Sequence, residues 1–415
     1  MSELMNIPNL RFPDFSDDWQ VSKLGDVTSK IGSGSTPRGG EEVYTSDGIL
    51  FIRSQNVKRN ILDLTDSTFI PEEVHFQMSG SEVKSNDVLL NITGASIGRS
   101  CVVPSSVITG NVNQHVCIVR TGRHLEPNFL QPFLASRRGQ KLIYQGQTGS
   151  GREGLNFQSI RSFKLSLPTK PEQQKIAAFL AAVDSKIEQL SKKQALLGEY
   201  KKGLMQQIFS QAIRFKADDG SAFPVWEEKN IVELAKTSIG LVTSMTPYYV
   251  DKGVPLIRNN DIFQNKIRKE KLIRLDYEFD QLNKNRRLFT NDIVTVHTGN
   301  IGASAVIDEE LNGCQGFATL NTRIKNQNEI SSSFLCWYYN STRNIKYALS
   351  MATGDGRSNY NLKDFNKATI PVPSLPEQTK IAAFLTAADN KIEQVGKQFD
   401  ESKQFKKALL QQMFV

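Results

Sequence analysis

The chain has 415 residues, more than one hydrophobic core usually organises, so we expect at least two domains. Its hydrophobic content of 39% and charged content of 23% are those of a globular protein and exclude bulk disorder. The net charge of +8 permits a polyanionic partner without requiring one.

The N-terminal segment MSELMNIPNLRFPDF lacks the basic and apolar regions of an export signal, and no run of about 18 apolar residues occurs. We therefore expect a soluble, unexported, cytoplasmic protein with no membrane partner. The cysteines form no C-x-x-C pair, which argues against a disulfide framework and a zinc ribbon. We expect no metal site and four reduced core thiols: Cys101, Cys117, Cys314 and Cys336.

In chain order, the sequence predicts a globular module, a long helix, a second module and a second long helix. Short β-branched runs such as ILFIR, DVLLNIT and HVCIVR are separated by Gly, Ser, Asn and Pro turns, and helices are expected over 128–144 and 333–349. The modules are therefore α+β. The expected boundaries are 1–170 (module one), 171–212 (first helix), 213–375 (module two) and 376–415 (second helix).

An internal repeat relates the two halves. PEQQKIAAFLAAVDSKIEQL at 171–190 and PEQTKIAAFLTAADNKIEQV at 376–395 are identical at fifteen of twenty positions, 205 residues apart. Asn86-Asp87 recurs with this spacing as Asn291-Asp292, and Thr93-Gly94 as Thr298-Gly299. A shared period indicates duplication. Because the intervening segments NVNQHVCIVRTGRH and NGCQGFATLNTRIK differ, the copies share a scaffold and not a surface.

Each long helix has the same entry and the same apolar seam. Thr169-x-x-Glu172 and Ser374-x-x-Glu377 are typical of a capping box. Apolar residues then follow in steps of four and three, which predicts a heptad seam. Its main members are Ile176, Leu180, Val183, Ile187 and Leu190 in the first helix and Ile381, Leu385, Ile392, Val395 and Phe399 in the second.

Two such helices in one chain can pair as an antiparallel coiled coil with a pseudo-twofold axis. The alternative is that each helix packs only on its own module. Charged residues outside the seam also recur, which suggests two identical faces that dock two copies of one partner protein. These residues are Lys175, Asp184, Lys186 and Glu188, repeated as Lys380, Asp389, Lys391 and Glu393.

On these features the chain resembles the specificity subunit of type I restriction-modification enzymes. The resemblance covers essentially the whole chain. It rests on the duplication and on the helix entries LSLPTKPEQQKIAAFL and IPVPSLPEQTKIAAFL, with weaker support from GSGSTPRGG, YTSDGILFIRSQNV, NDVLLNITGASIG and TGSGREGLN.

The resemblance implies that each module is a target-recognition domain for one half of a split double-stranded DNA site. The helices would form the antiparallel spacer and dock two adenine-N6 methyltransferase subunits, which bind S-adenosylmethionine. Restriction and translocase subunits, which use ATP and Mg²⁺, would complete the endonuclease. No cofactor is expected in this chain.

Candidate DNA contacts follow from side-chain chemistry. Arg and Lys pair with guanine, Asn and Gln pair with adenine, and phosphates take Lys, Arg, Ser and Thr. In module one the candidates are Thr36, Arg38, Arg53, Gln55, Asn56, Lys58, Arg59, Ser96, Arg99, Asn113, Gln114 and Arg152. In module two they are Arg258, Asn259, Asn260, Lys266, Arg268, Thr298, Asn300, Arg357, Ser358 and Asn359.

We find no catalytic motif. The chain has no D-P-P-Y or N-P-P-Y, no phosphate loop and no H-E-x-x-H, and its four histidines are scattered. Methylation requires a flipped adenine in a dedicated pocket. We therefore predict a non-catalytic chain that supplies address and spacing. Two alternatives stay open: a self-contained methylase or nuclease with a degenerate motif, and a coiled-coil scaffold with no DNA role.

Overall fold

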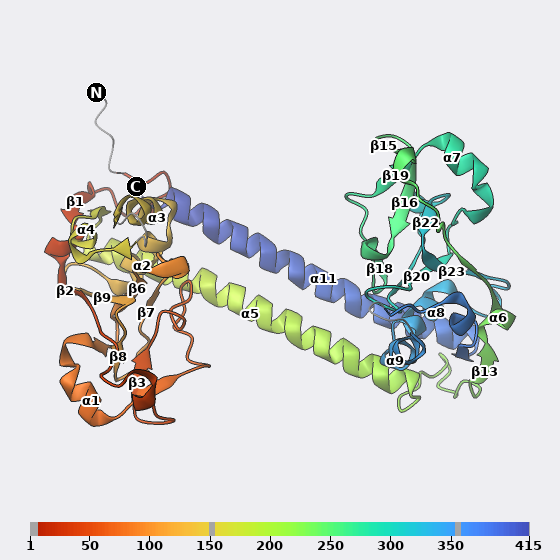
Figure 1. Ribbon diagram of the computed structural model, residues 1–415, viewed down its shortest axis with the longest axis horizontal. Helices are drawn as coiled ribbons and strands as arrows, with labels where there is room; N and C mark the ends of the chain where they lie inside the picture. Colours follow the sequence, from red (N-terminus) through yellow and green to blue (C-terminus); the bar gives the residue numbers. More distant parts are fainter. Residues whose placement is uncertain (1–6, 149–153, 353–357, 415) are drawn as a thin grey trace. The chain divides into compact units, whose positions relative to one another are not determined.

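The computed structural model describes residues 7–148, 154–352 and 358–414 (Figure 1). The chain divides into two compact units, of which unit 1 is Met1–Ser191 with Gly396–Val415 and unit 2 is Lys192–Val395. The long helices are α5 (Lys170–Phe209) and α11 (Leu375–Gln412). Each unit therefore combines one predicted module with segments of both helices.

Unit 1 is built on two four-stranded sheets. Its strands are β1 (Gln20–Lys23), β2 (Thr28–Ser33), β3 (Ile49–Ile52), β4 (Thr68–Ile70), β5 (Glu82–Lys84), β6 (Val88–Asn91), β7 (Ser100–Val102), β8 (Thr109–Val112), β9 (Val116–Thr121), β10 (Gln147–Thr148), β11 (Gly154–Leu155) and β12 (Lys164–Leu167). Its shorter helices are α1 (Glu72–Gln77), α2 (Pro127–Ala135), α3 (Arg137–Gln145) and α4 (Phe157–Arg161). One sheet is antiparallel with the order β2-β9-β6-β7; the other has the order β4-β3-β8-β5 with β3 and β8 parallel.

The central strand β6 explains how these layers stack. All four of its residues, VLLN, are buried. Val88 and Leu90 pack in a cluster with Phe129 of α2, whereas Leu89 points the other way and packs with Ile52 of β3. Successive side chains of a strand point to opposite faces, so a strand covered on both sides is apolar throughout. The antiparallel sheet therefore lies between the helices and the second sheet.

Unit 2 repeats this plan. Its strands are β13 (Glu227–Asn230), β14 (Ala235–Ile239), β15 (Tyr249–Val250), β16 (Val254–Arg258), β17 (Ile262–Phe263), β18 (Lys266–Ile267), β19 (Ile273–Leu275), β20 (Ile293–Val296), β21 (Ser304–Val306), β22 (Gln315–Phe317), β23 (Thr319–Ile324) and β24 (Thr369–Val372). Its shorter helices are α6 (Ile231–Leu234), α7 (Tyr277–Leu282), α8 (Ser332–Tyr339), α9 (Thr342–Met351) and α10 (Leu362–Phe365). The order β14-β23-β20-β21 matches the first sheet of unit 1, and the parallel pair β16-β22 matches β3-β8.

The repeat extends to single backbone angles. Asn60 and Asn86 have φ of 67° and 69°, and Asn265 and Asn291, each 205 residues later, have 58° and 72°. Asparagine adopts this left-handed region more readily than most residues. The predicted duplication is thus confirmed in the fold.

Each helix expected over 128–144 and 333–349 is in fact two helices. Ser136 separates α2 from α3, and Ser341 separates α8 from α9. Both serines have extended backbones, and their hydroxyls accept a hydrogen bond from the backbone three residues on, from Gly139 and Asn344 respectively. The sequence pattern missed these breaks because both segments are apolar on one face and the N-caps lie within the pattern.

Within each unit, segments of α5 and α11 run antiparallel and share the core of the globular part. Asp184 pairs with Lys406 in unit 1, and Lys201 with Asp389 in unit 2; each pair is the other shifted by 205 residues. Residues of both helices join these cores: Ile176, Leu180, Leu409 and Met413 in unit 1 and Met205, Ile208, Ile381 and Leu385 in unit 2. The alternative that each helix packs only on its own module is therefore wrong.

The other predicted seam residues are buried to different extents. Leu190 and Val395 are buried, and Val183, Ile187, Ile392 and Phe399 are partly buried.

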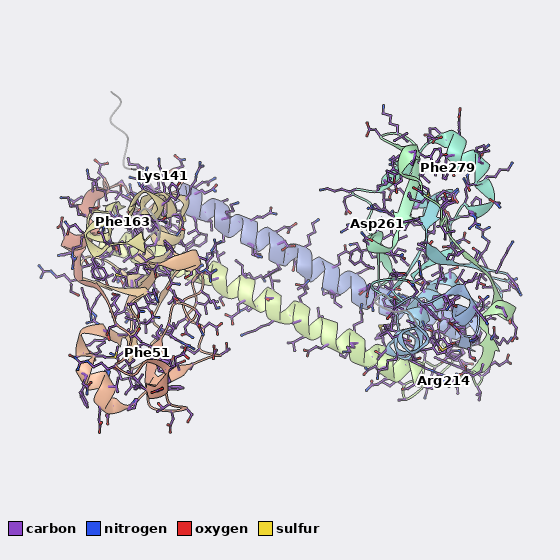
Figure 2. The ribbon with its side chains drawn as sticks, in the orientation of Figure 1. Phe51, Lys141, Phe163, Arg214, Asp261 and Phe279 are labelled. Atoms are coloured by element: carbon purple, nitrogen blue, oxygen red, sulfur yellow. The ribbon has the colours of Figure 1, made fainter. Side chains whose placement is uncertain are left out.

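The two helix entries are fixed by a buried carboxylate. Glu172 is fully buried, and Arg11 donates to both of its oxygens at 2.7 and 2.8 Å. In unit 2, Arg214, which is labelled in Figure 2, donates to Glu377 at 3.1 and 2.7 Å. A tryptophan ring nitrogen donates to each carboxylate as well, from Trp19 and Trp226. The expected capping boxes are thus corrected, because each glutamate carboxylate turns to an arginine and a tryptophan.

All four cysteines are free and buried, as predicted. Burial raises the pKa of the Cys101, Cys117 and Cys314 thiols to about 12. Among the described residues, no helix is long and apolar enough to cross a membrane.

Candidate nucleic-acid interface

Three loops of unit 1 enclose an open cleft of about 1060 Å³. They are the loop after β3, the loop between β6 and β7, and the turn between β8 and β9. Four predicted DNA contacts line it: Gln55, Lys58, Ser96 and Arg99. Lys58 and Arg99 are exposed. The cleft therefore offers positive charge for phosphates beside neutral groups that can bond to base edges.

The buried Asn91, at the end of β6, holds two of these loops together. Its amide donates to the backbone oxygen of Ser54 at 2.8 Å and to the Ser96 hydroxyl at 3.0 Å. Gly98 has a φ of +82°, and a Cβ there would lie 2.9 Å from the side-chain oxygen of Gln140. Hydrogen bonds and close packing within unit 1 therefore fix the loops that line the cleft.

The loop after β3 uses some of the predicted contacts internally. Asn56 is 3% exposed; it accepts from the Arg53 backbone at 2.9 Å and donates to the carbonyls of Asp63 and Asp66 at 3.0 and 3.1 Å. Its amide is engaged within the loop, so we leave Asn56 out of the proposed DNA surface. The exposed Asp66 carboxylate accepts from Gln55 at 2.9 Å and lies 3.7 Å from Arg53.

A chain of hydrogen bonds crosses the third side of the cleft. Thr36 donates to Gln114 Oε1 at 2.8 Å, Gln114 Nε2 lies 3.2 Å from His115 Nε2, and His115 Nδ1 lies 2.5 Å from Thr93 Oγ1. Asn113 Oδ1 accepts from the His115 backbone at 3.1 Å. Sequence reasoning named Thr36, Asn113 and Gln114, and the structure brings them together. Two further predicted residues are exposed: Arg38 and Arg59.

Unit 2 has a smaller cleft, of about 790 Å³, with a different balance of charge. Asp261, which is labelled in Figure 2, is 2% exposed and lies 3.1 Å from Arg258 and 3.4 Å from Arg268. The Arg268 guanidinium also lies 5.6 Å from the centre of the Phe263 ring. Lys266 lines the same cleft. Both arginines are therefore positioned, and partly neutralised, by one buried carboxylate.

Other candidates in unit 2 surround Thr298. Its hydroxyl donates to Asn359 Oδ1 at 2.6 Å and lies 3.0 Å from His297 Nδ1. Burial lowers the pKa of His297. Asn259 donates to the carbonyl of Ala318 at 3.4 Å. The exposed candidates are Asn260, Asn300, Ser358 and Asn359. Arg152 and Arg357 lie outside the described residues.

Several predicted docking residues have partners within the chain. Lys175 pairs with Asp14 in unit 1, and Lys380 pairs with Asp218 at 2.6 Å in unit 2. Asp184 and Asp389 form the interhelical pairs described above, and Glu393 lies 2.7 Å from Lys266. Ion pairs within the chain therefore account for much of the repetition of charged residues outside the seam. The exposed members are Lys186, Glu188, Lys391 and Glu393.

Several residues that line the two clefts were missing from the sequence-based candidates, among them Thr93, His115, Asp261 and Glu270. Thr93 could have been found, because Thr93-Gly94 recurs as Thr298-Gly299. His115 follows Gln114 directly. The carboxylates gave no comparable signal, because acidic groups are not expected to face DNA. Over the described ranges, no group of three or more His, Cys, Asp or Glu side chains could hold a metal ion.

Comparison with known proteins gives one family. The model of the type I restriction modification DNA specificity domain matches twice, at residues 16–197 and 225–399. A protein of Methanocaldococcus jannaschii named for the MjaX type I restriction enzyme specificity subunit is 22% identical, over 98% of this chain and 95% of its own. The MjaVIII specificity subunit of the same organism is also 22% identical, over 97% and 92%.

A solved structure has the same fold. The S subunit of a type I restriction-modification system from M. genitalium superposes with a TM-score of 0.59, at 15% identity, over 99% of each chain.

Proposed function

The chain belongs to the type I restriction-modification DNA specificity family, and we propose that it selects DNA by reading one half of a bipartite double-stranded site with each unit. One observation carries this proposal. The two family-model matches coincide with the two copies of one scaffold, and each copy presents a polar, cationic cleft with different side chains. A shared scaffold with two different surfaces suits two different half-sites.

The proposed DNA surface in unit 1 is the cleft lined by Gln55, Lys58, Ser96 and Arg99 together with the turn Asn113–His115. In unit 2 it is the cleft of Arg258, Lys266 and Arg268, with Asn260, Thr298 and Asn300 on neighbouring loops. Lys and Arg would anchor phosphates, and the amides and hydroxyls would face base edges.

The long helices would set the unread gap between half-sites and dock two methyltransferase subunits. Lys186 and Lys391 are equivalent exposed residues, 205 positions apart, and fit two copies of one partner. We assign adenine-N6 methylation, with S-adenosylmethionine, to that partner, and ATP- and Mg²⁺-dependent restriction to a further subunit. The present chain would contribute no catalytic group.

The test is to replace residues 1–170 with the first module of another family member. Each chimera is combined with its methyltransferase partner, and N6-methyladenine is mapped across genomic DNA. We expect one half of the methylated motif to change and the other half to persist. Change in both halves, or in neither, contradicts the two-reader proposal.

The same assay separates the other two possibilities. Methylation or cutting by the purified chain alone would favour a self-contained enzyme. Absence of sequence-selective DNA retention in the presence of the methyltransferase would favour a protein scaffold.

A further inference from the structure

Two facing loops that line the cleft of unit 1 are each one residue longer than the equivalent loops of unit 2. β6 and β7 are joined by residues 92–99, whereas β20 and β21 are joined by 297–303. In the parallel strand pair, Val112 lies opposite Ile52 and Gly316 opposite Ile257, so residues 113–115 correspond to only 317–318. Thr93 and His115, which touch, stand on these two longer loops.

The hydrogen-bond chain across these loops has a direction. The Thr36 hydroxyl donates to Gln114 Oε1, so the amide nitrogen of Gln114 faces His115 Nε2 as a donor. His115 Nε2 must then accept, which leaves the ring proton on Nδ1. That proton is donated to Thr93 Oγ1. Thr93 therefore receives a hydrogen bond and keeps its own hydroxyl proton to donate.

Unit 2 uses the equivalent hydroxyl differently. Thr298 pairs with Asn359 in an isolated bridge between their backbones and donates its proton to Asn359 Oδ1 at 2.6 Å. Thr93 forms the same bridge with Gly154, 205 residues before Asn359. Glycine has no side chain to take the Thr93 proton. Among the residues that the structure describes, the Thr93 hydroxyl bonds to His115 alone, and Thr93 lines the cleft, so its proton is available to a group that enters there.

We propose that Gln114, His115 and Thr93 form the specificity element of unit 1, which presents Thr93 Oγ1 as a hydrogen-bond donor. Thr93 would touch the base, and His115 and Gln114 would be positioning residues that fix its polarity. The donor selects a base edge with an acceptor, such as a purine N7, guanine O6 or thymine O4, over the amino groups of adenine and cytosine. This inference rests on the proposed DNA-reading function.

The decisive variant is Gln114→Glu, which reverses the chain. A carboxylate can only accept, so in an assay at about pH 8.5, which favours the neutral imidazole, the ring proton moves to Nε2 and Nδ1 becomes an acceptor. Thr93 must then donate to His115, and its oxygen faces the cleft as an acceptor. At one position of the first half-site, we expect preference to move toward an amino-bearing base by about ten-fold, since an unpaired buried polar group costs about that much.

The assay maps N6-methyladenine in the complex of full-length chain and methyltransferase. Thr93→Val should lose discrimination at the same position, Thr93→Ser should retain it, and the second half-site is the internal control. His124→Phe, an exposed histidine outside the cleft, should leave the motif unchanged. His115→Phe should relax the position.

The outcomes separate this inference from the function on which it rests. A bipartite wild-type motif with an unchanged first half in Gln114→Glu and Thr93→Val overturns the inference and leaves the proposed function standing. Uniformly weaker methylation with unaltered preference also overturns it, because that is the effect of a structural role. If the wild-type complex methylates no bipartite motif, both the inference and the proposed function are wrong.

Discussion

At the scale of single residues, the same buried triad closes both helix entries. Glu172 and Glu377 are fully buried, and each is held by a bidentate arginine and a tryptophan N–H. Breaking a buried ion pair by removal of one partner leaves an uncompensated charge in the core, which is far more costly than loss of an exposed pair.

Arg214→Met should therefore destabilise unit 2 strongly. The side chain keeps its apolar length but leaves Glu377 without its cation, so we expect a loss of about 3–5 kcal/mol in the free energy of unfolding. Chemical denaturation followed by tryptophan fluorescence measures it. Arg343→Met is the matched control, because Arg343 pairs with Glu228 on the surface and should cost less than about 1 kcal/mol. Equal effects of the two variants would contradict the assigned role of Glu377.

Side-chain chemistry identified the polar candidates for DNA contact, but it did not show which of them are free to face a ligand. Gln55, Lys58, Ser96 and Arg99 line one cleft although β3 and β6 belong to different sheets, because Asn91 at the end of β6 bonds to both loops. Asn56 was indistinguishable from them in sequence, yet the turn buries it. Whether an amide faces solvent or its own backbone depends on loop conformation, which residue type does not determine.

At the scale of elements, an ion pair between β18 and α11 joins two residues for which the sequence predicted different roles. Lys266 was a candidate DNA contact and Glu393 a candidate docking residue, and they lie 2.7 Å apart. Both are exposed, so the pair adds little stability. In unit 1, isoleucine stands at the position of Lys266, 205 residues earlier. The link is thus specific to unit 2.

Glu393→Gln should release Lys266 for phosphate contact. We expect stability to change by less than about 1 kcal/mol, and the slope of log affinity for DNA against log salt to steepen by about 0.9. Fluorescence titration of the chain with its methyltransferase partner over a range of NaCl concentrations measures the slope. Glu401→Gln, which changes another exposed glutamate of α11, should leave it unaltered. An unchanged slope in Glu393→Gln would show that Lys266 does not reach DNA.

The elements themselves were largely predictable. The entry motif placed the starts of the long helices at 171 and 376, next to the observed Lys170 and Leu375, and the heptad periodicity predicted that the helices continue, because a continuous apolar stripe is a strong local pattern. The partners of Glu172 were not predictable in the same way. A capping box and a buried ion pair use the same residue, and the choice depends on Arg11, which lies 161 residues away in the chain.

At the scale of the whole molecule, the 205-residue repeat makes the two interhelical ion pairs equivalent. Asp184 with Lys406 and Asp389 with Lys201 exchange roles when 205 is added or subtracted. Polar pairs beside an apolar seam penalise a shifted register, because a slip would separate the charges. One duplicated sequence thus specifies the same helix contact in both units.

Insertions that lengthen α5 and α11 test whether these helices set the unread gap between the half-sites. Seven residues inserted after Ser191 in α5 and after Gln398 in α11 preserve the seam and add about 10 Å of helix, at ~1.5 Å per residue. Since base pairs are spaced by about 3.4 Å, we expect the unread gap in the methylated motif to lengthen by about three base pairs with both half-sites unchanged. Methylome mapping of the reconstituted complex measures the gap.

Five residues inserted at the same two places provide the control. Five residues add about 7.5 Å but rotate the apolar stripe by about 140°, to the far side of each helix, so paired helices should lose stability and the complex should lose methylation. An active seven-residue variant with the original gap would contradict the spacer role of α5 and α11. It would leave intact the assignment of one half-site to each unit, because that assignment depends on the clefts and not on the distance between them.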